Sequence, residues 1–246
     1  VIAQDITRYG MDWDGKPHLA DLLEELCKLD FHWIRLHYLY PEWIDDRLID
    51  VIAREDKILK YLDIPLQHCN DKILKKMNRR GDKKYLCALL DKLRERIPGL
   101  VLRTSIIAGL PGEGEEEFDE LCDFLREQKL LRAGVFPYSP EEGTRAAKME
   151  RVDSDEAARR AERIVDIQSE IIDAWNDERQ GDVMEVLCEG FDGQSMLFVG
   201  RSYAESPDID GRIYFSAPRD VAAGEFVPVR ITGAMDGELT GELAEE

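Results

Sequence analysis

Hydrophobic and polar positions alternate in two ways along residues 1–150. Short apolar runs, typical of buried strands, end at Ala3, Leu36, Ile64, Ile107 and Phe136. Between them, apolar residues recur every three or four positions, as in helices that pack on a core, at 19–29, 44–53, 73–77, 85–96 and 115–127. Strands that alternate with helices predict parallel βα units. Five strands are too few to close an eight-stranded barrel, so we expect an α/β partial TIM-like barrel whose first strand is missing.

A different pattern follows this predicted barrel. Asp153 is placed as the N-cap of a charged helix, with Glu156 three residues later, and Gly181 ends it. From Asp182 onward the hydrophobic period is two, and Asp-Gly turn pairs at 192–193, 210–211 and 236–237 separate the runs. We therefore predict a partial barrel over 1–150, a linker helix over 151–180 and a small antiparallel, OB-like β-barrel over 181–246.

Composition indicates a soluble globular protein. Its 246 residues are 43% hydrophobic, which is enough for one large core and one small one. No apolar run approaches the roughly 18 residues of a membrane span, and the start at Val1 lacks both an initiator Met and the basic region of a signal peptide. We expect a cytoplasmic protein without a membrane partner, whose beginning is missing from this chain.

The five cysteines are scattered along the chain. None forms a C-x-x-C pair, so neither disulfides nor a self-contained metal site is expected. Cys27, Cys87 and Cys122 lie in Leu-rich helical patterns, where a buried apolar role is usual. Cys69 follows a predicted strand and is the one cysteine placed near chemistry.

Candidate chemistry gathers where three predicted strands end, in the segments 61–70, 101–113 and 133–144. In the second segment, the glycine-rich turn at 109–114 lacks the Gly-Lys-Ser/Thr of a P-loop and is followed by Glu115, Glu116 and Glu117. This turn is either a βα connection whose helix is capped by its own glutamates, or a place where the backbone approaches a ligand.

Individual side chains in these segments leave alternatives open. His68 is either a base or metal ligand, or a hydrogen-bonding group, which is the more frequent role. Amides and a guanidinium, which suit the polar edges of a cofactor and its carboxylate, occur at Gln67, Asn70 and Arg79. Phe136 and Tyr138 either stack on a purine ring or belong to the core.

Taken together and in order, these blocks resemble the radical SAM methylthiotransferase family. The resemblance rests on Leu62-Asp-Ile-Pro-Leu-Gln-His68 with the following 70–80, on 104–113, and on Phe136-Pro-Tyr-Ser-Pro-Glu-Glu-Gly-Thr144, and it covers nearly the whole chain. The terminal barrel resembles the TRAM domain of that family. Ile2-Ala-Gln-Asp5, the Pro-Leu-Gln-His block at 65–68 and especially the segment 200–211 are similar to the members that modify an aspartate of the small-subunit ribosomal protein S-twelve.

The resemblance also implies cofactors. S-adenosyl-L-methionine (SAM) would be cleaved at a four-iron four-sulfur cluster, giving a radical that removes hydrogen from the aspartate β-carbon, and a second four-iron four-sulfur cluster would supply sulfur. The chain lacks the family's C-x-x-x-C-x-x-C, so the cluster ligands are expected outside it and the chain alone is expected to be inactive. No metal ligand or catalytic residue is therefore assigned within it.

By matching position, the resemblance places SAM against Gln4, Gln67, Arg79, Arg103, Thr104, Phe136 and Tyr138. Arg79 or Arg103 would hold the SAM carboxylate. The simpler alternative is that either arginine pairs with a neighbouring acid at the barrel rim.

Charge bears on the choice of partner. The chain carries −19, and residues 181–246 contain four basic and fourteen acidic side chains, a net charge of −10. A domain that grips tRNA should be basic, whereas one that docks a basic ribosomal protein can be acidic. We therefore expect ribosomal protein S-twelve as the partner of the acidic TRAM domain. A tRNA-adenosine methylthiotransferase of the same family and a non-catalytic ribosome-binding barrel are the alternatives.

Overall fold

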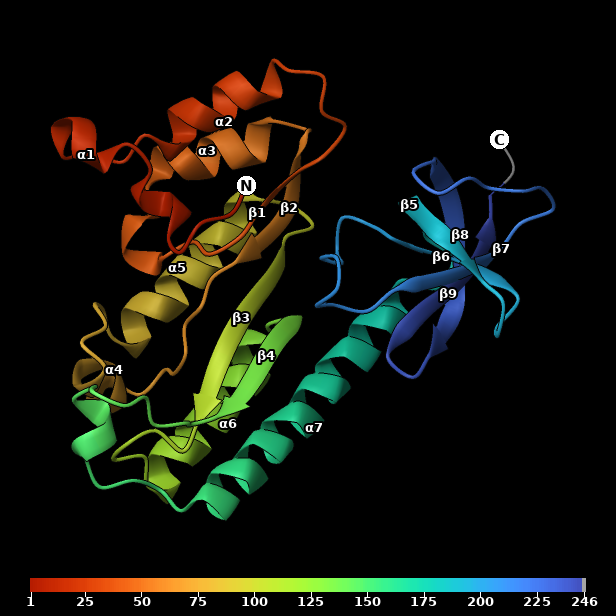
Figure 1. The fold of residues 1–246 in the computed structure, drawn as a ribbon. Helices are drawn as coiled ribbons and strands as arrows, with labels where there is room; N and C mark the ends of the chain where they lie inside the picture. The colour runs from red at the N-terminus through yellow and green to blue at the C-terminus, as the bar shows by residue number, and fades with distance from the viewer. Residues whose placement is uncertain (245–246) are drawn as a thin grey trace. The chain divides into compact units, whose positions relative to one another are not determined.

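The computed structural model describes residues 1–244, and the chain divides into two compact units, Val1–Gln168 and Ser169–Glu246 (Figure 1). The first unit contains a parallel sheet and helices, and the second contains a closed β-barrel. Both features were predicted from the hydrophobic periods. Among the described residues, no helix is both long and apolar enough to cross a membrane.

The sheet of the first unit has four parallel strands in the order β1 (Ile34–Leu36), β2 (Ile58–Asp63), β3 (Val101–Ala108) and β4 (Arg132–Pro137). Consecutive strands are connected through α3 (Asp46–Arg54), then α4 (Asp71–Lys76) and α5 (Lys83–Arg96), then α6 (Glu115–Gln128). The remaining short helices of this unit are η1 (Ile6–Arg8), α1 (Met11–Asp14), α2 (Leu19–Cys27), η2 (Pro41–Trp43) and η3 (Ala146–Lys148). Repeated βα units in this order confirm the expected partial barrel.

Side-chain alternation along β3 distinguishes the two faces of the sheet. The side chains of Leu102, Thr104, Ile106 and Ala108 are buried, whereas those of Arg103, Ser105 and Ile107 are only half buried. A parallel strand covered on both faces is expected to be buried throughout. We call the less buried side the open face, and it carries Arg103, Ser105 and Ile107 of β3 and, in register on β4, Gly134 and Phe136.

The predicted strand ending at Ala3 is wrong. Val1 does lie beside β1, because its ammonium donates to the Arg35 carbonyl at 2.7 Å and its carbonyl accepts from the His37 amide at 3.2 Å. Ile2 and Ala3 are exposed and the chain then bends into η1, where Asp5 caps the Thr7 amide. Only Val1 makes strand-like hydrogen bonds in this segment, so residues 1–3 do not form a strand.

Helix α7 (Ser154–Glu178) follows the sheet. Its N-terminus is capped as predicted, since the Asp153 carboxylate accepts from the amides of Asp155 and Glu156 at 3.0 and 3.4 Å. Within the first unit, the buried Gln168 amide donates to the carbonyls of Leu130 and Leu131 at 2.9 and 2.7 Å. These bonds fix the helix to the start of β4.

The barrel of the second unit closes in the order β5-β6-β7-β9-β8 (Figure 1). Its strands are β5 (Val183–Asp192), β6 (Leu197–Arg201), β7 (Ile213–Ser216), β8 (Phe226–Met235) and β9 (Glu238–Leu243). Inward positions alternate with exposed ones along β5 and β8, and the inward side chains form a core around Val186, Phe215 and Val229. This confirms a small OB-like barrel.

Two details of the barrel differ from the prediction. Strands β7 and β9 pair in parallel, so the barrel is not antiparallel throughout. Strand β9 was not predicted, because its sequence, Glu238-Leu-Thr-Gly-Glu-Leu243, contains only two apolar residues and shows no clear period of two. Backbone hydrogen bonds to β8, formed across the Asp236–Gly237 turn, hold it in the extended conformation instead.

Candidate functional site

Polar side chains meet in a row across the open face, near the carboxyl ends of β1 and β2. Asp63 ends β2 and is fully buried, and its Oδ1 accepts from Arg103 Nη1 at 2.9 Å. On the other side, Asp63 Oδ2 lies 3.5 Å from His37 Nδ1. Arg132 stands next in the row, because it is in register with Arg103. Ligands of parallel α/β sheets bind outside the carboxyl ends of the strands, where Asp63 and His37 lie, whereas Arg103 and Arg132 stand near the amino ends of β3 and β4.

The Asp63 carboxyl group is held in its charged form. Burial alone would raise its pKa, but the hydrogen bond from His37 and the charge of Arg103 outweigh burial and hold the pKa below the usual aspartate range. Arg103 thus pairs with a neighbouring acid, as the simpler of the two sequence interpretations expected. The signal for this row was present in the sequence, as two charged residues inside apolar strands, but nothing in it gave the register.

Gly134 leaves room on the open face for its two neighbours. A methyl group at this position would lie 3.2 Å from the Phe136 ring and 3.4 Å from Arg103 Nη2. The Phe136 side chain is 54% exposed, so it is not a core residue. The exposed ring and the guanidinium of Arg103, whose side chain is only 10% exposed, thus lie beside Gly134 in one patch on the open face. The exposed ring suits an aromatic part of a ligand.

Gln67 and Thr104 are held by hydrogen bonds within the fold, Gln67 through its backbone and Thr104 through its hydroxyl. The Thr104 hydroxyl is buried and accepts from the Leu66 amide at 3.1 Å. Gln67 has a left-handed backbone, with φ of 68°, and forms an extra rung beside β3 by bonding to Ser105 O and Ile107 N at 2.8 and 3.0 Å. This rung leaves the half-buried Gln67 side chain at the strand end.

Tyr138 follows β4, and its amide donates to the Ala108 carbonyl at 2.8 Å. Its hydroxyl is buried and has no hydrogen-bond partner within residues 1–244. A buried phenol normally finds a partner, so this oxygen has unused capacity for a ligand.

Arg79 and Gln4 are not joined to that patch by any contact in the described part of the chain. The Arg79 guanidinium lies 4.8 Å from the centre of the Tyr40 ring and makes no ion pair there. Tyr40 in turn donates its amide to the Thr7 hydroxyl at 3.3 Å, which places Arg79 and η1 around the same residue. Gln4 is exposed just before η1.

His68 belongs to a buried network that holds two strand-end loops to α7. Its Nδ1 accepts from the Asn70 amide at 3.0 Å, so a neutral ring carries its proton on Nε2, which lies 3.3 Å from Glu113 Oε2. Arg160 Nη1 donates to Glu113 Oε1 and to the Glu113 carbonyl at 2.9 and 3.0 Å. The role of His68 is therefore that of a hydrogen-bonding group inside the fold. The sequence gave no sign that Arg160 completes this network.

The glycine-rich turn is closed by its own glutamates. The Glu113 carboxylate accepts from the Gly109 amide at 2.9 Å, and Glu117 accepts from the Gly114 amide at 3.1 Å. The second bond caps the start of α6, and the three glutamates at 115–117 place negative charge there, which disfavours phosphate. The turn is therefore capped by its own glutamates, as the first of the two interpretations expected.

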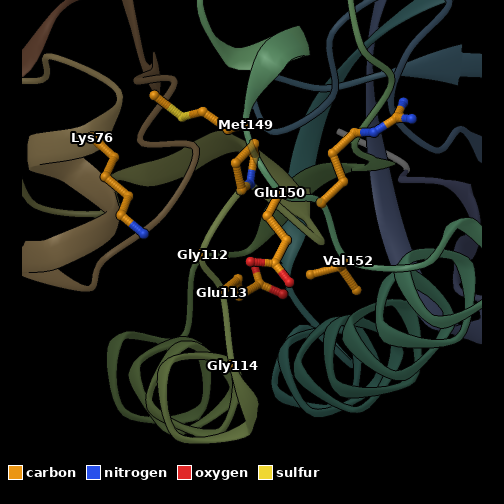
Figure 2. A pocket seen from close by; sticks show the side chains of 9 residues that line it. Lys76, Gly112, Glu113, Gly114, Met149, Glu150 and Val152 are labelled. Atoms are coloured by element: carbon orange, nitrogen blue, oxygen red, sulfur yellow. The ribbon is translucent and has the colours of Figure 1, made fainter.

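A surface pocket of about 550 Å³ lies beside this turn (Figure 2). Lys76 points into it from α4, and Glu150 enters from the segment before α7. A side chain at position 112 would collide with the Lys76 ammonium, and the φ of 85° at Gly112 independently favours glycine. The charges that line the pocket are of both signs, so they do not select one ligand.

Cys69 is fully buried, and its Sγ lies 3.7 Å from the Glu120 carbonyl. Burial raises the pKa of its thiol. The prediction that this cysteine lies near chemistry is therefore not supported by its surroundings. Across residues 1–244, no three His, Cys, Asp or Glu side chains are arranged to hold a metal ion.

Residues 8–125 match the radical SAM superfamily, and residues 181–244 match the TRAM domain. Coproporphyrinogen III oxidase (HemN) from Escherichia coli, described as a radical SAM enzyme, is similar in structure, with a TM-score of 0.52 and 21% identity. The similarity covers 64% of this chain and 39% of that one, and it shows a shared fold.

Longer similarities come from proteins named ribosomal protein uS12 methylthiotransferase RimO. The relative from Symbiobacterium thermophilum is 47% identical over 100% of this chain and 51% of its own length. Those from Acetivibrio thermocellus and Pelotomaculum thermopropionicum are 43% and 48% identical, over 100% and 98% of this chain and 55% of each relative. The chain thus spans about half the length of the curated relatives it matches. With both domains matched in order and relatives this similar along its whole length, the chain belongs to the radical SAM methylthiotransferase family.

Proposed function

We propose that the intact protein containing this chain adds a methylthio group to the β-carbon of an aspartate in ribosomal protein uS12. The observation that carries the proposal is identity of 43–48% over essentially all of this chain to relatives named for that reaction. Bound SAM and iron–sulfur clusters would supply the radical, the methyl group and the sulfur. The two clusters would be held by residues outside this chain.

The patch on the open face suits SAM. Phe136 offers an exposed ring for the adenine, and the unpartnered Tyr138 hydroxyl offers a hydrogen bond. Gln67 carries an amide for polar edges, and Thr104 fixes the loop that presents Gln67. Gln4, which no contact joins to the patch, would have to reach SAM from the segment before η1. These groups would orient SAM and exclude water from it.

Of the two arginines proposed for the SAM carboxylate, Arg79 has the freer guanidinium. Arg103 already binds Asp63 through Nη1, whereas Arg79 only stacks on Tyr40. In the intact protein, Arg79→Ala should weaken SAM binding about tenfold to a hundredfold, the usual value of one charged hydrogen-bonded pair. Arg80→Ala is the matched control, because Arg80 also stacks on an aromatic ring, at 5.8 Å from Trp43. Equal SAM affinity of the two variants, measured by equilibrium dialysis, would exclude this role.

The acidic barrel is proposed to dock the basic ribosomal protein. Its net charge of −10 would repel tRNA and attract a cationic surface. Three of its four arginines are already bonded within the barrel: Arg201 to Glu189, Arg219 to Glu225 and Arg230 to the Gly181 carbonyl. Little positive charge is therefore left to hold a phosphate backbone.

The decisive experiment gives the intact, anaerobically reconstituted protein SAM, a reductant and one of two substrates. Small ribosomal subunits should gain one methylthio group on uS12, read by mass spectrometry of its peptides. Modification of tRNA and not of uS12 would establish the sister activity instead. SAM cleavage without modification of either substrate would refute the proposal as stated.

A further inference from the structure

Residues 9–18 form a rigid projection on the first unit. Glycines with left-handed backbone stand at both ends of α1, with φ of 78° at Gly10 and 82° at Gly15. The His18 amide donates to the Tyr9 carbonyl at 2.7 Å and closes the base of the projection. A methyl group at Gly10 would lie 2.8 Å from His18 Cβ and 3.0 Å from the Trp13 ring, so the segment is packed at its turn. A loop fixed in this way loses little conformational freedom on binding.

Ionic contacts fix the base of the same projection. His18 lies between two carboxylates, with Nδ1 2.8 Å from Asp21 and Nε2 3.1 Å from Asp14. Asp21 also bonds to Arg47 of α3. The hydrogen bonds to Asp21 and Asp14 raise the pKa of His18. Asp14 and Asp21 are therefore committed to internal contacts.

Trp13 is the exposed part of this projection. Its side chain is 63% exposed, among the highest of any large apolar residue described in the first unit. The Tyr9 ring meets it edge to face at 5.4 Å between centroids, and the His18 ring lies 5.3 Å away. The indole is thus held in one orientation while most of its surface faces water. Rigid exposed tryptophans of this kind are characteristic of binding hot spots.

The charges around Trp13 favour a cation. Asp12 is exposed beside it and makes no ion pair within residues 1–244. Asp14 and Asp21 are taken up by His18 and Arg47. Asp5 and Asp12 therefore stand against Arg8 and Lys16 in this segment, and the excess negative charge is that of the whole chain, −19. A stacking surface for nucleic acid needs a positive groove, which this segment does not provide. An indole face next to a free carboxylate instead suits an ammonium or guanidinium.

We infer that Tyr9, Asp12 and Trp13, the Trp13 platform, form a docking site for a lysine or arginine side chain of a basic protein partner. The cation lies over the indole face and pairs with the Asp12 carboxylate. Given the proposed function, the partner is the basic ribosomal protein that is modified. The residues of the platform are not among those proposed for the SAM patch or for the acidic barrel.

The test measures the affinity of the intact protein for purified ribosomal protein uS12, for tRNA and for SAM. Trp13→Ala should weaken uS12 binding about three- to thirtyfold, the range for a cation over an aromatic ring, and Trp13→Phe should give a smaller loss. Asp12→Asn should weaken it further when combined with Trp13→Ala, and should reduce the salt dependence of binding. SAM affinity should not change in any of these variants.

Asp30 and Phe31 provide the matched control. They are also an exposed acid beside an exposed aromatic, 47% exposed at Phe31, but they lie beyond the opposite end of α2. Asp30→Asn and Phe31→Ala should leave uS12 affinity unchanged. If the platform variants match these controls, or weaken tRNA binding, or change only self-association, the inference is overturned. If the proposed function itself is wrong, the result is different: uS12 is then neither bound nor modified by the wild type or by any variant.

Discussion

Replacing Arg160 with alanine tests the buried network most directly. Glu113 has a fully buried side chain, and Arg160, at 6% exposure, is its only cationic arginine or lysine partner within residues 1–244. Removing one partner of a buried ion pair typically costs about 3–5 kcal/mol, because the other charge stays buried. Glu113 keeps His68 and the Gly109 amide, so we take the lower end, about 3 kcal/mol. The bond of Arg160 to Glu115, which is 74% exposed, adds little.

The assay is urea unfolding of Arg160→Ala against Arg163→Ala. Arg163 lies on the same helix and over the same Phe118 ring, at 5.3 Å against 5.1 Å for Arg160, but its ion pair with Asp119 is half exposed. With a slope of about 2 kcal/mol per molar urea, Arg160→Ala should lower the midpoint by about 1.5 M. Hydrogen exchange of β3 amides reports on the first unit alone, which matters because two units need not unfold together. A loss within about 1 kcal/mol of that of Arg163→Ala would refute the reasoning.

The same network sets a pH dependence. Burial alone would raise the pKa of Glu113. The contacts with His68, the Gly109 amide and Arg160 outweigh burial and lower this pKa below the usual glutamate value. A carboxyl group whose pKa is lowered on folding stabilises the protein above its unfolded pKa, about 4.3, and loses that contribution as pH falls through the lowered value. The wild type should therefore lose stability below about pH 4.3, and Arg160→Ala should show a flatter dependence.

Three further changes have defined outcomes. Gly200→Ala should destabilise the barrel by about 1–3 kcal/mol, because its methyl group would lie 2.5 Å from the Leu187 carbonyl, while Gly193→Ala, with open space around it, should change the melting temperature little. Asp63→Asn should lower the free energy of unfolding of the first unit by about 3 kcal/mol, because it removes the carboxylate that pairs with Arg103. An unchanged midpoint of urea unfolding would contradict this. Cys69 should resist iodoacetamide in the folded protein and react only in urea, as peptide mass mapping can show.

Periodicity alone predicted most of the architecture, since apolar repeats record which side of an element meets the core. It misplaced a strand at Ala3 and missed β9, because both depend on a neighbouring strand more than on their own residues. The contacts within the site could be predicted less well from the sequence. Pro-Leu-Gln-His68 and the glycine-rich turn marked the strand ends, but the pairing of Asp63 with Arg103 depends on strand register. Arg160 reaches Glu113 from 47 positions away, a contact that no local pattern encodes.

The barrel of the second unit is closed and the sheet of the first unit is open, so the two units should differ in their tendency to self-associate. Every strand of the β5–β9 barrel is paired on both sides, so it offers no free row of amides and carbonyls to another molecule. The parallel sheet ends in β1 and β4, and among residues 1–244 only Val1 lies alongside the outer edge of β1. Residues 1–168 expressed alone should therefore tend to form edge-to-edge aggregates, whereas residues 169–246, which are also strongly acidic, should stay dispersed at high concentration.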